Sequence, residues 1–351
     1  MSRIANQTSL SSPWPRRVAT VLIAATFPMI WIGGLVTTYD AGMAVPDWPT
    51  TFGYNPLAYP WTTWFYGPWD LFIEHGHRLL GMVVGLVAIA LVATVWRFER
   101  RRSLRWLSVV CLLAVVAQGV LGGMRVVLAD TQLAMIHGCL GPAFFAFAVA
   151  LATLLSNRWS SATVPGKISG IARLQALSLV TAILAYVQLI LGAQLRHLPV
   201  TSDPQQFRLA VLAHLVMAAI VSLHVLLLII RVLRSARRES WLTRPAALMG
   251  ILLGTQLMLG VGTWASKYGW PTWLPSVEFA QAYTVAAESR LQAWITTGHV
   301  AVGSLFVATS VALALRVFRI AYLLKKSPPF APEAIRAVEP VPDFLPKAAT
   351  A

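Results

Sequence analysis

The sequence predicts an all-α membrane protein of eight transmembrane helices. Three observations predict this class. Of the 351 residues, 57% are hydrophobic and only 12% are charged, which is about half the charged fraction of a soluble globular domain. Eight apolar runs each approach the roughly 20 residues that a helix needs to cross a bilayer. The basic residues gather in short clusters between alternate runs.

The eight apolar runs give the expected positions of the membrane helices. They cover residues 18–37, 74–96, 106–124, 132–156, 172–195, 209–231, 245–264 and 292–315. The first run follows Arg16 and Arg17, as the apolar core of a signal peptide does. It is long for such a core, and no small-residue cleavage site follows it directly, so we expect a membrane span there.

The basic residues predict the orientation. The net charge of +15 does not lie along one face, so we expect no nucleic-acid partner. Clusters at 97–105, 231–244 and 316–326 share one side of the membrane, and the positive-inside rule makes that side cytoplasmic. We therefore expect both termini in the cytoplasm. The short N-terminus has no clear transit peptide, which favours a multi-pass protein of a bacterial inner (cell) membrane over a mitochondrial one.

The odd-numbered runs repeat a motif that hints at a four-helix unit used twice. Gln and Gly stand four residues apart in QGVLGG at 118–123, QLILGA at 188–193 and QLMLGV at 256–261, and the weaker MIWIGG lies at 29–34. Small residues let membrane helices pack closely, or they clear room for a flat, bulky ligand. Both interpretations can hold together. The expected divisions are a cytoplasmic segment 1–17, an N-terminal bundle 18–156, a cytoplasmic linker 157–171, a C-terminal bundle 172–320 and a disordered cytoplasmic tail 321–351.

Two outer connections, about 38–73 and 265–291, are long and aromatic. Such loops either cover a site as lids or serve as simple connectors. The first is so aromatic that we expect a lid. The two cysteines, Cys111 and Cys139, fall inside apolar runs, so we expect no disulfide framework and no cysteine metal site.

Four of the seven histidines share one position on alternate helices. Each lies near the outer end of an even-numbered run, and a small residue follows four positions later; they are His77, His137, His214 and His299. Counted at about 1.5 Å per residue, all four lie roughly 26 to 32 Å from the basic boundary. Ionisable residues in spans are uncommon and usually functional. Because haem iron takes axial nitrogens from both sides, two histidine pairs at one depth predict two haem sites.

The other three histidines are expected to be structural. His75 faces nearly the opposite way from His77 on the same helix, His197 lies in an outer loop, and His224 lies deeper than His214. A lone histidine in a membrane helix is more often a packing or hydrogen-bonding residue than a ligand.

Charged side chains near the outer side complete the candidate site. Glu74 shares a helix face with His77, so it either takes part in proton transfer or charge stabilisation, or simply marks the start of the helix. Five arginines are placed either to bind haem propionates or to anchor helices at the membrane surface. They are Arg78, Arg125, Arg196, Arg208 and Arg290.

These motifs resemble the haem A synthase family of cytochrome oxidase assembly proteins. The segment EHGHR at 74–78 followed by LLG at 79–81 is similar to that family's E-x-x-H-R-x-x-G signature. The segments GGLVT at 33–37, AG at 41–42 and DWP at 47–49 resemble its first span and first outer loop. His137, His214 and His299 fall where the family has its other histidines. The chain departs from the pattern at Leu215 and Val300, where some relatives place Arg.

The resemblance implies a fold and a reaction. It implies a pseudo-twofold pair of four-helix bundles, in which His77 and His137 hold the substrate haem O and His214 and His299 hold a permanent haem b. The family oxygenates the C8 methyl of haem O to a formyl group with molecular oxygen, and Glu74 matches the carboxylate implicated in that chemistry. Haem O synthase and an aa-type oxidase are the implied partners.

Two other function classes are consistent with histidines in membrane helices. A non-catalytic dihaem cytochrome b could pass electrons from quinol, although familiar ones place two histidines on each of two helices. A transporter could use histidines as proton relays. Bound haem and its oxidation products distinguish the three classes.

Overall fold

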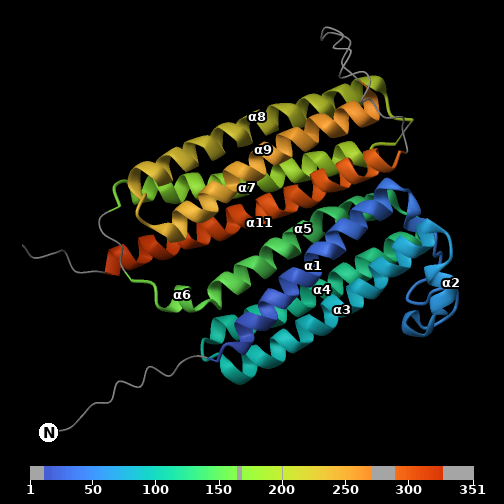
Figure 1. Ribbon diagram of the computed structural model, residues 1–351, viewed down its shortest axis with the longest axis horizontal. Coiled ribbons are helices and arrows are strands. Elements are labelled where there is room, and N and C mark those ends of the chain that lie inside the picture. Colours follow the sequence, from blue (N-terminus) through green and yellow to red (C-terminus); the bar gives the residue numbers. More distant parts are fainter. Residues whose placement is uncertain (1–11, 164–167, 200, 270–288, 327–351) are drawn as a thin grey trace, which may run out of the picture.

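The computed structural model describes residues 12–163, 168–199, 201–269 and 289–326. Within this part of the chain, eight helices are long and apolar enough to cross a membrane, which confirms the predicted all-α membrane fold. They lie along one long axis in Figure 1. The eight are α1 (Trp14–Thr38), α3 (Trp69–Phe98), α4 (Arg102–Val127), α5 (Thr131–Leu154), α7 (Ile171–Arg196), α8 (Pro204–Ser235), α9 (Ser240–Tyr268) and α11 (Arg290–Lys326).

Carboxylates mark where several helices begin. Asp130 accepts hydrogen bonds from the backbone N–H groups of Gln132 and Leu133 at the start of α5. Asp203 accepts one from Gln205 at the start of α8. The first N–H groups of a helix have no intrahelical partner, so these side chains satisfy donors that would otherwise be unpaired.

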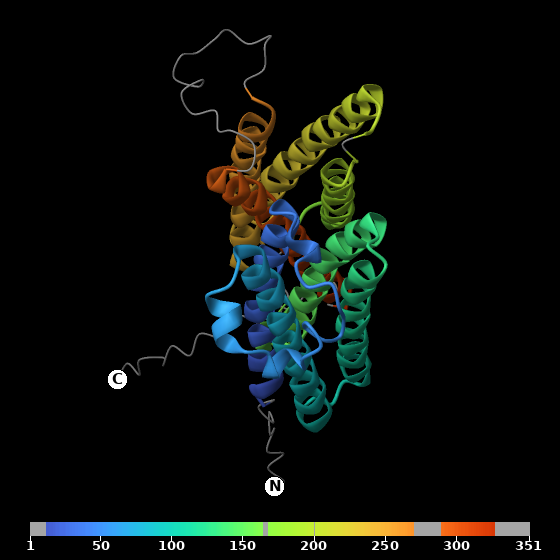
Figure 2. The same cartoon turned by 90° about the vertical axis from the view of Figure 1, so that its right-hand side faces the viewer.

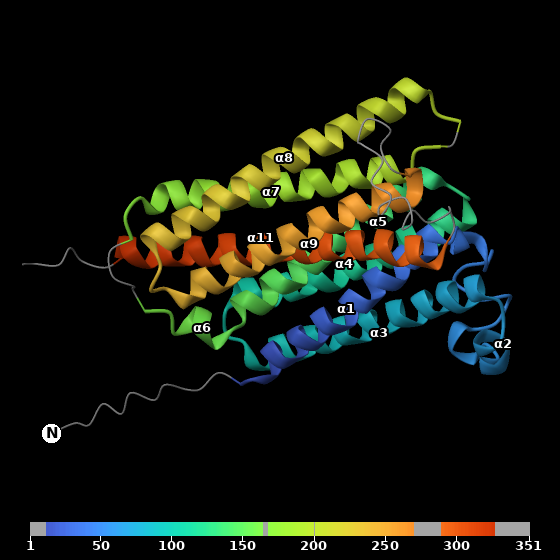
Figure 3. The same cartoon turned by 45° about the horizontal axis from the view of Figure 1, so that its top comes forward.

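The helices pack as two rings of four. In the first ring α1 packs on α3, α3 on α4, α4 on α5, and α5 back on α1. In the second ring α7, α8, α9 and α11 make the equivalent contacts. The rings meet because α11 also packs on α1 and α5, and it runs along the middle of the molecule in Figures 1 and 3. Accordingly α11 is the most buried of the long helices.

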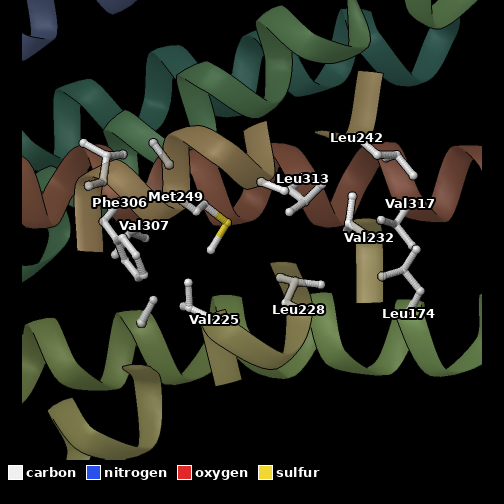
Figure 4. Packing of buried hydrophobic residues seen from close by; sticks show 14 of the residues in the cluster. Leu174, Val225, Leu228, Val232, Leu242, Met249, Phe306, Val307, Leu313 and Val317 are labelled. Atoms are coloured by element: carbon white, nitrogen blue, oxygen red, sulfur yellow. The ribbon is translucent and has the colours of Figure 1, made fainter. Parts of the chain in front are cut away.

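The second ring has a continuous apolar core. Figure 4 shows Leu174 of α7, Leu228 of α8 and Met249 of α9 converging on Leu313 and its neighbours on α11. All four of these side chains are essentially inaccessible to solvent. In lipid this close packing, rather than removal of apolar surface from water, holds helices together.

The two ends of the helix bundle differ in chemistry. One end, which we call the basic face, carries the clusters at 97–105, 231–244 and 316–326 together with the short helix α6 (Asn157–Ser160). The opposite end, which we call the loop face, carries α2 (Trp61–Phe65) and the segment around it, seen from that side in Figure 2. The membrane orientation of the two faces stays a prediction.

Several helices extend beyond the apolar runs. α1 begins at Trp14 rather than at residue 18, and α11 continues to Lys326 rather than ending near 315 or 320. The apolar stems of arginine and lysine let their charged groups reach the polar boundary from a helix end. These helices therefore continue past the first basic residues, where the apolar runs stop. The proposed tail lies outside the described residues from 327 onward, as does most of the second long loop, at 270–288.

Candidate functional site

The four histidines on alternate helices lie in two pairs, with the two rings of each pair steeply inclined to one another. The ring centroids of His77 on α3 and His137 on α5 are 6.4 Å apart, with the ring planes at 85°. The centroids of His214 on α8 and His299 on α11 are also 6.4 Å apart, at 68°. Each ring of four helices therefore contributes one pair.

Each of these histidines packs on a glycine of the preceding long helix. A Cβ atom added at Gly33 would lie 2.8 Å from Cε1 of His77, closer than real side chains approach. The corresponding distances are 3.0 Å from Gly122 to His137, 3.0 Å from Gly192 to His214 and 3.3 Å from Gly260 to His299. These are the glycines of the repeated motif, so the repeat makes room for the imidazole rings.

The glutamines of the same motif lie against the histidines. Nε2 of Gln188 is 3.2 Å from both ring nitrogens of His214, and Nε2 of Gln256 is 3.4 Å from Nε2 of His299. Gln118 donates instead to the backbone carbonyl of His137, at 3.3 Å. The small residue four positions after a histidine accommodates this amide: a Cβ at Gly303 would lie 3.2 Å from Gln256 Nε2. It therefore clears space for a glutamine, in addition to bordering the ligand space.

A cavity of about 820 Å³ connects the two pairs, and all four histidines line it. Its walls are mostly apolar and come from both rings of helices. The volume lies within the roughly 300–1,000 Å³ typical of cofactor and ligand sites.

The pairs fit an iron porphyrin. Two imidazole nitrogens that bind one metal ion from opposite sides each lie about 2 Å from it, which places the ring centroids about 6 Å apart, as observed for both pairs. The Nδ1 atoms of His77, His137 and His299 are buried and have no hydrogen-bond partner among the described residues. The backbone carbonyls of Met29, Gln118 and Gln256 lie close enough to interact with these rings. A proton on Nδ1 would leave Nε2 of each ring free to bind iron.

The charged residues that line the cavity are all positive among the described residues. Arg125, Arg196 and Lys267 line the cavity, and no Asp or Glu is among the described residues that do so. Arg196 is buried, and its Nη2 donates to the carbonyl of Gly34, at 2.7 Å, and to the hydroxyl of Thr38 on α1. It therefore joins the second ring of helices to the first, and the positive lining favours an anionic ligand.

Two comparisons relate this chain to known proteins. The family model described as cytochrome oxidase assembly protein matches residues 68–201, which include the first histidine pair. The chain is 26% identical over 266 residues to a curated protein named haem A synthase from Shouchella clausii (strain KSM-K16), a match that covers 70% of this chain and 85% of that protein. Both matches make this chain similar to haem A synthases and to the cytochrome oxidase assembly proteins of that family model.

The E-x-x-H-R segment at 74–78 holds the connection between α1 and α3 in place. Glu74 is buried, accepts a hydrogen bond from the backbone N–H of Val45 at 2.9 Å, and pairs with Arg78 at 2.9 Å. Arg78 also donates to the carbonyls of Val45, Asp47 and Thr50. Neither Glu74 nor Arg78 lines the cavity, but Glu74 interacts electrostatically with Arg125, which does.

This connection covers the end of the first ring of helices at the loop face. The indole of Trp48 lies on the backbone of Gly123, where an added Cβ would overlap it, and the guanidinium of Arg125 lies equally close to Gly42. Although partial burial alone would raise the pKa of Asp47, hydrogen bonds from the Gly53 N–H, the Thr50 hydroxyl and the Phe52 N–H lower it to about 2. The prediction that this loop is a lid stays open.

The remaining predicted residues have distinct places. His75 hydrogen-bonds to the Thr51 hydroxyl, at 3.1 Å, and its ring packs on Tyr59 and Trp64, so it also fixes the loop. His224 does not line the cavity. Arg208 and Arg290 are exposed and do not line it either.

His197, which was expected to be a structural residue of a loop, lies at the cavity. It lines the cavity, and its Nε2 would lie 4.0 Å from a Cβ at Gly138, next to His137. Burial, together with the nearby charges of Arg196 and Arg125, lowers its pKa to about 4, so it is neutral at physiological pH. Its position just after a helix, in a loop, gave no signal of this contact between the two rings.

Proposed function

We propose that this chain is a haem A synthase-like membrane oxygenase, which converts the C8 methyl of haem O to a formyl group for cytochrome oxidase assembly. The observation that carries the proposal is the pair of matched histidine sites, each with ring centroids 6.4 Å apart, on one shared cavity. The similarity to a curated haem A synthase and to the cytochrome oxidase assembly family model supports it.

The residues present would hold two porphyrins in different roles. By the family resemblance, His77 and His137 would hold the substrate haem O, and His214 and His299 would hold haem b. Haem iron, when bound, supplies electron transfer and activation of molecular oxygen. The glycines set how closely each imidazole ring approaches the helix behind it.

The cations on the cavity wall would bind the porphyrin propionates. Arg125 belongs to the first ring of helices, while Arg196 and Lys267 belong to the second. Leu215 and Val300, which follow the second pair of histidines, line the same cavity where some relatives place Arg. We infer that the ends of α7 and α9 supply in this chain the positive charge that those relatives place beside the histidines.

Glu74 would act from behind the site. It touches the outer loop and Arg78 rather than the cavity, and it interacts with Arg125 electrostatically. This placement favours charge stabilisation through Arg125 over direct proton transfer from substrate. Loss of Glu74 would then affect oxidation of haem O more than its binding.

The haem extracted from the purified protein tests the proposal. In cells that make haem O, mass spectrometry should find haem A or hydroxylated haem O beside haem b in the wild type. Glu74→Ala should retain haem O with little oxidised product, and His77→Ala should lose haem O but keep haem b. His214→Ala is the matched control, which should lose haem b.

Two outcomes favour the other function classes. Haem b alone, under conditions that supply haem O and oxygen, favours a dihaem cytochrome that transfers electrons without oxygenation. A purified, folded protein without Soret absorbance favours a transporter.

A further inference from the structure

A cluster of arginines and tryptophans lies where the two rings of helices meet at the basic face. We call it the seam cluster; it consists of Arg158, Trp159, Trp241, Arg244, Arg316 and Arg319. The rings of Trp159 and Trp241 make an edge contact, with centroids 6.1 Å apart. Arg158 and Arg316 each lie 5.8 Å from the Trp241 ring, and Arg319 lies 5.5 Å from the Trp159 ring. The cluster therefore joins α6 to α9 and α11.

Arg316 has one structural task in this cluster. Pro245 has no N–H, so the carbonyl of Trp241, four residues earlier in α9, has no helical donor. Nη1 of Arg316 donates to that carbonyl, at 3.2 Å. This hydrogen bond uses one N–H group of the Arg316 guanidinium, and its other N–H groups are not needed for this task.

The positive charge of the seam cluster is poorly balanced. Among the described residues, the one carboxylate that it pairs with is Glu239, which bonds to Arg158 at 3.3 Å. The Nε atoms of Arg316 and Arg319 are buried and have no hydrogen-bond partner among the described residues. Buried guanidinium donors without partners are costly, and an oxyanion would satisfy them.

An apolar pocket adjoins these arginines. It has a volume of about 350 Å³, and Arg244 and Arg316 line it together with apolar side chains of α1, α5, α9 and α11, among them Ile23, Val149 and Leu305. It therefore spans both rings of helices. A pocket of this size accommodates part of one acyl chain rather than a whole lipid.

We propose that the seam cluster binds the phosphate of an anionic phospholipid whose acyl chain enters the adjoining pocket. One guanidinium group can donate two parallel hydrogen bonds to the oxygens of a phosphate. Tryptophan side chains are enriched at the headgroup layer of the membrane. Basic pockets between membrane helices are suited to anionic headgroups. A lipid bound there would connect α6, α9 and α11 and so stabilise the contact between the two halves. This proposal is independent of the haem chemistry.

Native mass spectrometry of the full-length, delipidated protein tests the proposal. The probes are phosphatidylglycerol, phosphatidylcholine, sn-glycerol 3-phosphate and inorganic phosphate. We expect the wild type to retain one phosphatidylglycerol and to bind the other three weakly. The double variant Arg244→Gln/Arg319→Gln, which keeps Arg316 on the Trp241 carbonyl, should bind phosphatidylglycerol about tenfold more weakly or worse.

Two further variants keep the test decisive. Arg173→Gln, at an exposed arginine on the same face outside the cluster, should bind phosphatidylglycerol like the wild type. Val149→Phe fills the pocket without removing a charge, and it should also weaken lipid binding. Equal retention of phosphatidylcholine, equal binding of the water-soluble phosphates, or an equal loss in Arg173→Gln would overturn the proposal.

Discussion

Gly33 offers a sharp test of how the histidine pairs are built. A Cβ at this position would lie 2.8 Å from Cε1 of His77, whereas ordinary contacts begin at 3.4 Å. Gly33→Ala must therefore displace the ring by about 0.6 Å, which exceeds the roughly 0.2 Å tolerance of a metal–ligand distance. We expect the affinity of the first site for haem to fall about 10–100-fold, as when a group that orients a metal ligand is lost.

The sign of the effect distinguishes this explanation from ordinary helix propensity. Glycine to alanine inside an exposed helix stabilises it by about 0.5–1 kcal/mol. Gly254→Ala, at a position with no atom within 4 Å of the added Cβ, is the matched control and should be neutral or stabilising. The effect on haem should be largest at Gly33, smaller at Gly122 and Gly192, and smallest at Gly260, in the order of their distances.

Haem titration followed at the Soret band measures these affinities. His214→Ala is the background that isolates the first site for the Gly33 and Gly122 variants, and His77→Ala is the background that isolates the second site for the Gly192 and Gly260 variants. Haem content after gel filtration gives an independent value. Full haem affinity in Gly33→Ala, or an equal loss in Gly254→Ala, would refute the proposed role of the glycines.

Three further predictions concern residues around the cavity and loop. Gln256→Leu removes an amide that contacts Nε2 of His299, so haem affinity at the second site should rise by about two- to tenfold in a titration; a fall would mean that the amide orients the ring instead. Arg196→Gln should lower the Tm of the purified protein, because charge-assisted hydrogen bonds to α1 are lost, at about 1.5–3 kcal/mol each; an unchanged Tm would contradict that link. Because the pKa of Asp47 falls from 3.8 to about 2 on folding, its contribution to loop stability is complete above about pH 4 and is lost as the pH falls towards 2. Limited proteolysis of the loop should show this transition in the wild type and not in Asp47→Asn.

The helix positions and the pairing of the histidines could be predicted from the sequence. Length and apolarity fix a membrane helix with little help from tertiary contacts. Seven of the eight predicted runs lie within long helices, and the run at 132–156 extends two residues past the end of α5 at Leu154. Matched depth on alternate helices predicted two histidine pairs, and the resemblance to haem A synthases implied His77 with His137 and His214 with His299. The structure places the ring centroids of each of these pairs 6.4 Å apart.

The supporting residues were harder to predict, because their roles depend on contacts between distant segments. The repeated glycines were evident in the sequence, but their contact with the imidazole rings was not predicted. That contact depends on how two neighbouring helices are rotated about their own axes, which the sequence alone does not determine. Arg78 was expected at the porphyrin edge, whereas its donors are taken up by loop carbonyls 28 to 33 positions away. His197 was assigned a structural role, and only the meeting of the two rings brings it to the cavity wall.

The ligation state of the purified protein tests the central claim most directly. We predict that protein from cells making haem O binds two haem groups per chain, both low-spin and bis-histidine by electron paramagnetic resonance. His77→Ala should remove one signal with its haem O, and His299→Ala should remove the other with its haem b. A single haem, or a haem whose signal survives loss of both His77 and His299, would contradict two histidine-paired sites.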